Sequence, residues 1–177
     1  MKATGIVRRI DDLGRVVIPK EIRRTMRIRE GDPLEIYTDA GGEVIFKKYS
    51  PIGELSSFAA QYAESLIKGT QLAVIICDRD HCVAAAGLPK REVLERRVSP
   101  ALEDIMNSRR LFTATEEAYP ALDGVDRKIC VAAPILASGD VTGAVALLAT
   151  DSAATPTETD IKLVTVAAGF LGKQMEE

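Results

Sequence analysis

Short stretches of hydrophobic and charged residues alternate through the first 48 positions of the chain. β-Prone residues on either side of an Asp11–Gly14 turn predict two strands. Pro19 suits the first turn of a helix, because the N–H that it lacks has no intrahelical partner there. Two further strands follow, joined by a turn at 39–42. The predicted strand, strand, helix, strand and strand occupy residues 4–9, 15–18, 19–27, 34–37 and 44–46.

The rest of the chain combines helical and strand-like patterns. Apolar residues recur at steps of three and four through 51–68 and again through 157–175, which predicts two helices that pack along narrow seams. The second helix carries further apolar residues, Leu163, Val166 and Phe170, so one face can cover its own sheet and another a partner chain. Between these helices we expect strands at 72–77, 82–86, 129–136 and 141–149, a helix at 98–108 and an irregular segment at 109–126.

Charge is distributed unevenly along the chain. The net charge is −3, but residues 1–48 carry 11 Lys and Arg against 8 Asp and Glu, and residues 49–177 carry 12 against 18. A basic N-terminal part and an acidic C-terminal part indicate that the basic part contacts nucleic acid. The acidic part would repel DNA and leave the basic face as the docking surface.

The basic residues of the front segment gather on a predicted helix and two predicted strands. Nine lysines and arginines lie between Lys2 and Arg29, against three acids. Four of them follow helical spacing on one face, which is typical of a phosphate-binding surface; the alternative is solvated surface charge. Lys2, Lys47 and Lys48 are equally well explained as solvated ends. The leading candidates for DNA contact are Arg8, Arg15, Arg23 and Arg24, with Arg9, Lys20 and Arg27 as phosphate contacts.

Arginine in this stretch predicts how DNA would be recognised. Its planar guanidinium can bind guanine or phosphate in a bidentate manner. Since no Asn or Gln lies in the basic stretch to contact adenine, we hypothesise that groove width and bendability contribute to the choice of sites. A domain of about 50 residues buries little apolar area, so we also expect two copies to interleave their hairpins.

The cysteines give no sign of a metal or disulfide site. Cys77, Cys82 and Cys130 lie in apolar surroundings without a CxxC pair, and His81 is the only histidine. We expect reduced, buried thiols; the alternatives are a redox sensor at Cys77 and Cys82, and a haem or metal ligand at His81. No apolar run reaches the roughly 18 residues of a membrane helix. Residues 1–9 lack the apolar core of a signal peptide. We therefore expect a soluble cytoplasmic protein without metal or cofactor.

The N-terminal segment resembles a known family. Residues 1–50, including GIVRRIDDLGRVVIPKEIRRTMRIREGDPLEIYTDAGGEVIFKKY, closely resemble the AbrB-type transition-state regulators. That resemblance implies a swapped-hairpin β-barrel homodimer that binds double-stranded DNA through Arg8, Arg15, Arg23 and Arg24. The chain as a whole resembles sporulation regulators of bacilli. This implies a nucleoid-associated activator and repressor of sporulation genes in the developing forespore.

The second part, residues 56–177, resembles a GAF domain in the order of its elements. GAF domains are small-molecule sensors or dimerisation modules. A pocket for a small effector could lie between the sheet and the irregular segment; the alternative is an ordinary surface loop. The cyclic-nucleotide signature of some GAF domains is not found, nor is the cysteine pattern of GAF-type methionine-sulfoxide reductases. The polar candidates for the pocket are Thr113, Thr115, Glu116, Glu117 and Tyr119.

These observations predict an α+β protein with three parts: a DNA-binding domain at 1–50, a linker helix at 51–68, and a GAF-like domain at 56–177 that includes this helix. Two self-associating modules predict a homotetramer. No carboxylate, histidine or nucleophile spacing indicates catalysis, and no phosphate-binding glycine motif occurs, so an enzyme is not expected. The alternatives are an antitoxin-like or adaptor protein, although antitoxins usually end in a disordered tail, and an effector-binding module without DNA binding.

Overall fold

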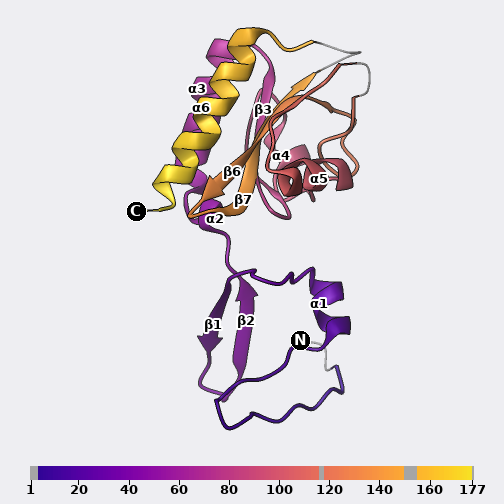
Figure 1. Ribbon diagram of the computed structural model, residues 1–177, viewed down its shortest axis with the longest axis vertical. Helices are drawn as coiled ribbons and strands as arrows, with labels where there is room; N and C mark the ends of the chain where they lie inside the picture. Colours follow the sequence, from indigo (N-terminus) through magenta and orange to yellow (C-terminus); the bar gives the residue numbers. More distant parts are fainter. Residues whose placement is uncertain (1–3, 116–117, 150–154, 177) are drawn as a thin grey trace. The chain divides into compact units, whose positions relative to one another are not determined.

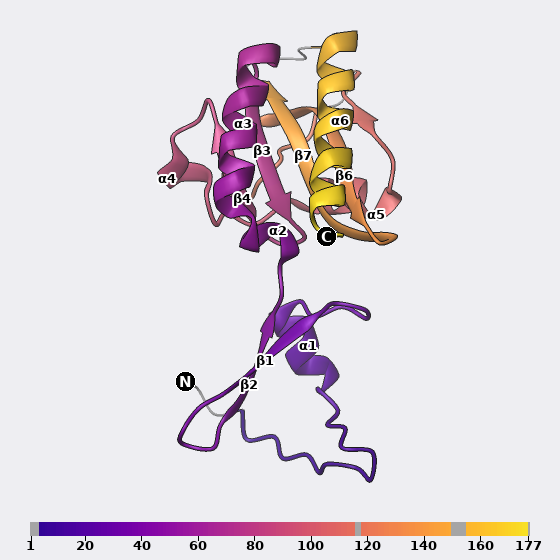
Figure 2. The ribbon, with the colours of Figure 1, turned by 90° about the vertical axis from the view of Figure 1, so that its left-hand side faces the viewer.

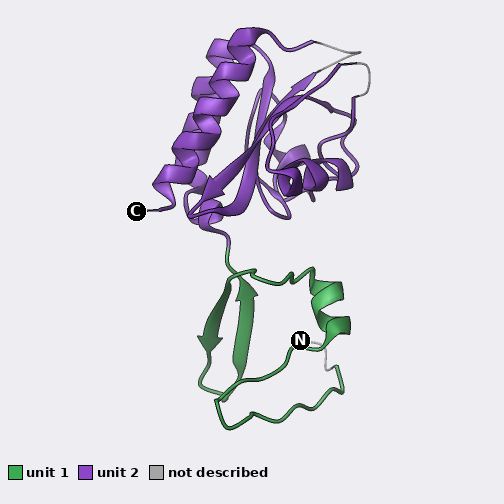
Figure 3. Cartoon of the chain, in the orientation of Figure 1, with its two compact units in different colours: residues 1–49 green, residues 50–177 purple. Residues whose placement is uncertain are grey.

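The structure is a computed structural model and describes residues 4–115, 118–149 and 155–176. The chain divides into two compact units, residues 1–49 and 50–177, which Figure 3 colours separately. Both units mix helices and strands (Figure 1), as the sequence predicts. The elements of the N-terminal unit are α1 (Lys20–Met26), β1 (Leu34–Thr38) and β2 (Val44–Lys48).

In the N-terminal unit, β1 and β2 form an antiparallel hairpin that pairs Leu34 with Lys48 and Thr38 with Val44. The connecting turn is held by Asp39, whose carboxylate accepts the backbone N–H of Gly41 and of Glu43, both at 3.0 Å. These strands and their turn confirm the sequence prediction. Aspartate is common in such turns because its side chain can bind the backbone N–H groups that follow it.

The helix α1 begins immediately after Pro19 and ends at Met26, one residue inside each of the predicted bounds, with Arg27 as its C-cap. Arg27 has the left-handed conformation (φ 51°, ψ 40°). The N–H of Ile28 donates to the carbonyl of Arg23 (2.8 Å), and the N–H of Arg27 donates to the carbonyl of Arg24 (3.3 Å). This pair of bonds is a Schellman motif, in which glycine usually occupies the left-handed position.

The predicted strands at 4–9 and 15–18 are absent, and this part of the prediction is wrong for a single chain. The turn between them does form, since the Asp11 N–H donates to the Arg15 carbonyl (3.1 Å) and Gly14 adopts a positive φ of 76°. A strand needs a neighbouring backbone with which to pair. No described segment of the same chain forms a ladder with either stretch, and their apolar side chains stay exposed, with Val7 at 84% and Ile10 at 70%.

The C-terminal unit contains a five-stranded antiparallel sheet in the order β4-β3-β7-β6-β5. Helices α3 and α6 lie side by side on one face of this sheet, and α4 and α5 lie on the other (Figures 1 and 2). The elements are α2 (Pro51–Glu54), α3 (Ser56–Thr70), β3 (Ala73–Asp78), β4 (Cys82–Ala86), α4 (Lys90–Val93), α5 (Pro100–Ser108), β5 (Phe112–Thr113), β6 (Lys128–Ala137), β7 (Asp140–Ala149) and α6 (Glu158–Gln174).

Two hydrophobic cores fill the space on either side of this sheet. Alternate residues of β3 point to opposite faces, so Val74 and Ile76 belong to the core beneath α3 and α6, and Ile75 and Cys77 belong to the core beneath α5. All four are fully buried. The long apolar strands predicted from the sequence are therefore the centre of the sheet.

The predicted linker helix differs from the structure in one respect. It is two helices, because the helical geometry is interrupted at Leu55 (φ −93°, ψ 18°). The first piece is capped by Ser50, whose hydroxyl accepts the N–H of Gly53 at 3.0 Å, and it buries Ile52 completely. The second piece, α3, extends to Thr70, two residues beyond the predicted end. The short helix α4 and the two-residue strand β5 also escaped the sequence prediction.

Candidate nucleic-acid interface

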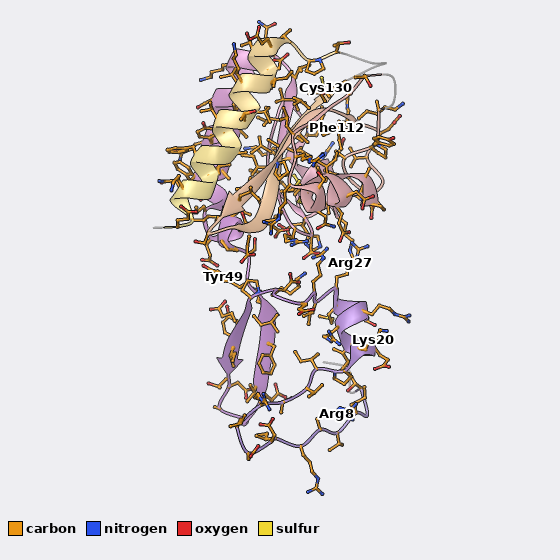
Figure 4. The ribbon with its side chains drawn as sticks, in the orientation of Figure 1. Arg8, Lys20, Arg27, Tyr49, Phe112 and Cys130 are labelled. Atoms are coloured by element: carbon orange, nitrogen blue, oxygen red, sulfur yellow. The ribbon has the colours of Figure 1, made fainter. Side chains whose placement is uncertain are left out.

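The basic residues singled out from the sequence lie on the surface of the N-terminal unit. Six of the seven are exposed, and Arg27 is half-buried. Figure 4 labels Lys20 at the start of α1, Arg27 at its end, and Arg8 in the extended segment before the Asp11–Gly14 turn. The exposed six are Arg8, Arg9, Arg15, Lys20, Arg23 and Arg24.

Helix α1 presents Arg23 and Arg24 in its last turn. Neither guanidinium forms a salt bridge with an acid in the described part of the chain. The predicted cationic helix face also included Arg27, but its left-handed backbone places it at the cap, outside the helical spacing. Lys20, Arg23 and Arg24 therefore make up the cationic face of the helix proper.

Arg15 is bound by Asp11 across the Asp11–Gly14 turn. Its Nε lies 2.8 Å from Oδ2 of Asp11, while Oδ1 of Asp11 accepts the backbone N–H of Arg15 (2.8 Å) and of Leu13 (3.0 Å). These bonds, that of the Arg15 backbone foremost, lower the pKa of Asp11. The carboxylate restricts the arginine side chain and offsets part of its charge, a pairing that sequence analysis did not identify.

Lys48 and Asp32 were also missed as members of this region. The sequence leaves Lys48 open between a DNA contact and a solvated end, but its side chain is only 26% exposed and its Nζ donates to the carbonyl oxygen of Arg27 at 2.8 Å. The same Nζ lies 3.3 Å from the carboxylate of Asp32. The neighbouring Lys47 remains exposed. An acid that follows a helix C-terminus is a weak signal for such a contact. Nothing in the sequence indicates that β2 ends beside the C-terminus of α1.

The described residues do not test the effector pocket predicted on the irregular segment. Thr113 is half-buried, Thr115 and Tyr119 are exposed, and Glu116 and Glu117 lie outside the described residues. Elsewhere in this unit, a depression of about 240 Å³ lies between α6 and β6. Its lining consists of Arg109, Leu111, Ala133, Pro134, Leu136, Thr165, Ala168 and Gly169. The effector site on the irregular segment stays a prediction.

The three cysteines are free and buried, as expected. Cys77 and Cys82 face each other across β3 and β4. The hydrogen bond with Cys82, followed by burial, raises the pKa of Cys77 well above its usual range, and burial raises the pKa of Cys130. Raised pKa values disfavour the reactive thiolate. Among the described residues, no three histidines, cysteines or acids gather to hold a metal ion, and no helix has the length and hydrophobicity to cross a membrane.

Comparisons with known proteins agree with this division into two units. Residues 54–176 match the family described as stage V sporulation protein T C-terminal, transcription factor, and residues 7–53 match the family described as antidote-toxin recognition MazE, bacterial antitoxin. The chain is 51% identical to stage V sporulation protein T of Bacillus subtilis over the full length of both proteins. It is also 63% identical, over 51 residues, to the transition state regulatory protein AbrB of the same organism; this match covers 29% of the chain and 52% of AbrB.

The C-terminal unit is similar in fold to GAF domains. The GAF domain of a phosphoenolpyruvate-protein phosphotransferase from Coxiella burnetii superposes with a TM-score of 0.55 at 15% identity, covering 68% of this chain and 82% of that one. An AbrB-like N-terminal unit followed by a GAF-like unit defines a class of bacterial regulators. Within that class, the chain belongs to the stage V sporulation protein T family, and is a sporulation transcription factor.

Proposed function

We propose that the N-terminal unit binds double-stranded DNA through its exposed arginines. Arg8, Arg15, Arg23 and Arg24 make the principal contacts, and Arg9, Lys20 and Arg27 contact phosphates. The observation that carries this proposal is the pair Arg23 and Arg24, exposed on α1 without a described acidic partner. An arginine that keeps its charge and lacks an internal partner is available for phosphate oxygens or a guanine edge. Family membership as a transcription factor supports the same conclusion.

The N-terminal unit acts as a dimer of interleaved hairpins. Pro19 is the one buried residue among the described residues of this unit, and Val7, Ile10, Leu13 and Val17 are each at least 69% exposed. A second copy would cover this apolar surface and supply strand partners for residues 4–9 and 15–18. The two-fold axis would then present two sets of arginines to pseudo-symmetric half-sites in DNA.

Changing Arg23 and Arg24 together to alanine tests the DNA contact. Anisotropy of a fluorescein-labelled duplex should show weaker binding by this variant. A control, Lys68→Ala with Arg91→Ala, removes the same charge from exposed positions of the C-terminal unit and should bind as the wild type does. If two chains neutralise about 6–10 phosphates, affinity should fall by about 10³–10⁵-fold between 50 and 200 mM salt. Equal binding by both variants, or binding insensitive to salt, would contradict the proposal.

The C-terminal unit joins two dimers into a homotetramer through α3 and α6. Phe58, Tyr62 and Phe170 form an aromatic cluster across these helices, with Tyr62 and Phe170 stacked at 5.6 Å between ring centroids. Phe170 remains 41% exposed and Val166 remains 63% exposed. An aromatic and aliphatic strip of this kind is typical of a surface covered by a partner. A light-scattering mass of only a dimer would refute the tetramer.

Regulation is the proposed role of the GAF-like unit, through a small effector bound near Thr113, Thr115, Glu116 and Tyr119. The helices α2 and α3 are the first elements of the C-terminal unit, directly after the N-terminal unit ends at residue 49, so an effector that shifts them would alter the spacing of two DNA-binding heads. A thermal-shift screen of the full chain against metabolite libraries tests this idea. A compound that raises the melting temperature should lose its effect in a Thr113→Val variant. A screen without stabilising compounds would count against a sensor role.

An antitoxin-like or adaptor function is the second candidate, since residues 7–53 match the family described as a bacterial antitoxin. The same hairpin surface would then bind a protein. Arg23→Ala with Arg24→Ala distinguishes the two candidates, because a DNA-binding protein loses its duplex while an adaptor keeps its protein partner in a pull-down. The favoured function is a non-enzymatic regulator that activates and represses sporulation genes on the nucleoid, in the cytoplasm of the forespore. Mapping the protein's occupancy across the genome tests whether it binds at sporulation genes.

A further inference from the structure

Lys48 and Asp32 form a shielded ionic bridge between the end of β2 and the end of α1. The Nζ of Lys48 donates to the Arg27 carbonyl (2.8 Å) and lies 3.3 Å from Oδ2 of Asp32. That carboxylate also accepts the backbone N–H of Arg29 at 2.8 Å, and its side chain is only 7% exposed. An ion pair so shielded from water is less screened than a pair on the open surface. The guanidinium of Arg29 also lies 3.9 Å from the same carboxylate oxygen, so Lys48 is the nearer of its two cations.

The bridge acts on the backbone that carries the DNA-binding arginines. Arg27 adopts the left-handed conformation, which is unfavourable for a residue with a Cβ, and its carbonyl receives the lysine. The Schellman bonds at this cap end on the carbonyls of Arg23 and Arg24. A helix of seven residues is marginally stable in water without tertiary contacts. The contact from Lys48 in β2 therefore stabilises the last turn of α1, which carries Arg23 and Arg24.

We propose that Lys48 and Asp32 are positioning residues for DNA binding. They fix the last turn of α1 against β2 and so hold Arg23 and Arg24 in one orientation before DNA arrives. Orientation matters because bidentate contacts of arginine depend on the placement of a planar group, and a preorganised surface loses less entropy on binding. This inference rests on the proposed function, DNA binding through Arg23 and Arg24.

Substitution of Asp32 distinguishes positioning from long-range electrostatics, because the two predict opposite changes in DNA affinity. Asp32 is an acid within a basic segment, so removing its charge should strengthen DNA binding if long-range electrostatics alone matter. Positioning predicts the opposite, a weaker complex. Glu30 is the matched control, because it lies in the same loop, carries the same charge and is exposed. Glu30→Gln should bind as tightly as the wild type or more tightly.

The experiment compares Asp32→Asn and Glu30→Gln in the full chain by anisotropy of a fluorescein-labelled duplex of mixed sequence. Asp32→Asn should weaken binding by about tenfold or more, the factor expected for losing one hydrogen bond to a charged group. In a chain that already carries Arg23→Ala and Arg24→Ala, the same change should cause no further weakening. Binding by Asp32→Asn as tight as that by Glu30→Gln would overturn the inference.

A second pair of variants decides the question if Asp32→Asn loses its far-UV circular dichroism. Lys48→Met removes the donor, and Lys47→Met removes the same charge from an exposed neighbour. Lys48→Met should weaken binding about tenfold more than Lys47→Met does, and Lys48→Arg should restore most of it. Equal losses for the two methionine variants would refute the positioning role. Failure of the proposed function looks different, since the wild type would then ignore the duplex.

Discussion

Replacing Gly172 by alanine should destabilise the C-terminal unit, because α6 touches β6 at this glycine. A Cβ at position 172 would lie 2.1 Å from the carbonyl oxygen of Leu136 and 3.1 Å from its carbonyl carbon. Close carbon–oxygen contacts are about 3.3 Å long, so the helix or the strand must move by about 1 Å. Overpacking of this kind costs about 1–3 kcal/mol. In a domain of this size, each kcal/mol lowers the melting temperature by about 4 °C.

Gly169 is the matched control for Gly172. It lies in the same helix, is exposed, and a Cβ there meets nothing within 4 Å. Gly169→Ala should raise stability by about 0.5–1 kcal/mol, since alanine favours the helix. Differential scanning calorimetry of both variants measures the two shifts. If Gly172→Ala melts at or above the wild-type temperature, or if both variants shift in the same direction, the close approach of α6 to β6 is wrong.

Three further predictions concern self-association, helix capping and pH. Phe170→Ser should lower the assembly mass measured by light scattering at a fixed concentration; an unchanged mass would exclude this face as the contact. Thr157→Ala removes the capping box with Asp160 at the start of α6 and should cost about 1 kcal/mol in denaturant unfolding; no change would mean that the cap contributes nothing. Because Arg15 lowers the pKa of Asp11, this bridge should be intact above the ordinary aspartate pKa and lost as pH falls through the lowered value. Titration followed by NMR should place Asp11 below its ordinary value, and a normal value would contradict the hairpin geometry.

Elements with local signals could be predicted from the sequence. Pro19 marks the start of α1, and the continuous apolar runs at 73–77 and 144–149 mark buried strands. These signals depend on residues close in sequence, where backbone preference and burial act together. The exposed arginines of α1 could be predicted equally well, because charged residues at helical spacing indicate a solvent-exposed helix face.

Contacts between distant segments could not be predicted in the same way. Lys48 and Arg27 are 21 positions apart, and only the fold brings the end of β2 to the cap of α1. The interruption at Leu55 follows a short helix that buries Ile52 completely, and apolar spacing alone does not specify where such a break falls. The strands predicted at 4–9 and 15–18 carry suitable residues, but strand formation requires a partner backbone, and β propensity supplies none.

The near absence of buried residues in the N-terminal unit has a consequence for when the regulator is active. The apolar side chains of this unit are uncovered in one chain. If two chains pair as proposed, ordering of this unit and pairing become a single equilibrium that depends on protein concentration. Dilution should therefore melt the DNA-binding head while the GAF-like unit, with its own cores, stays folded. The amount of protein in the cell would then act as a threshold for gene control, before any effector is bound.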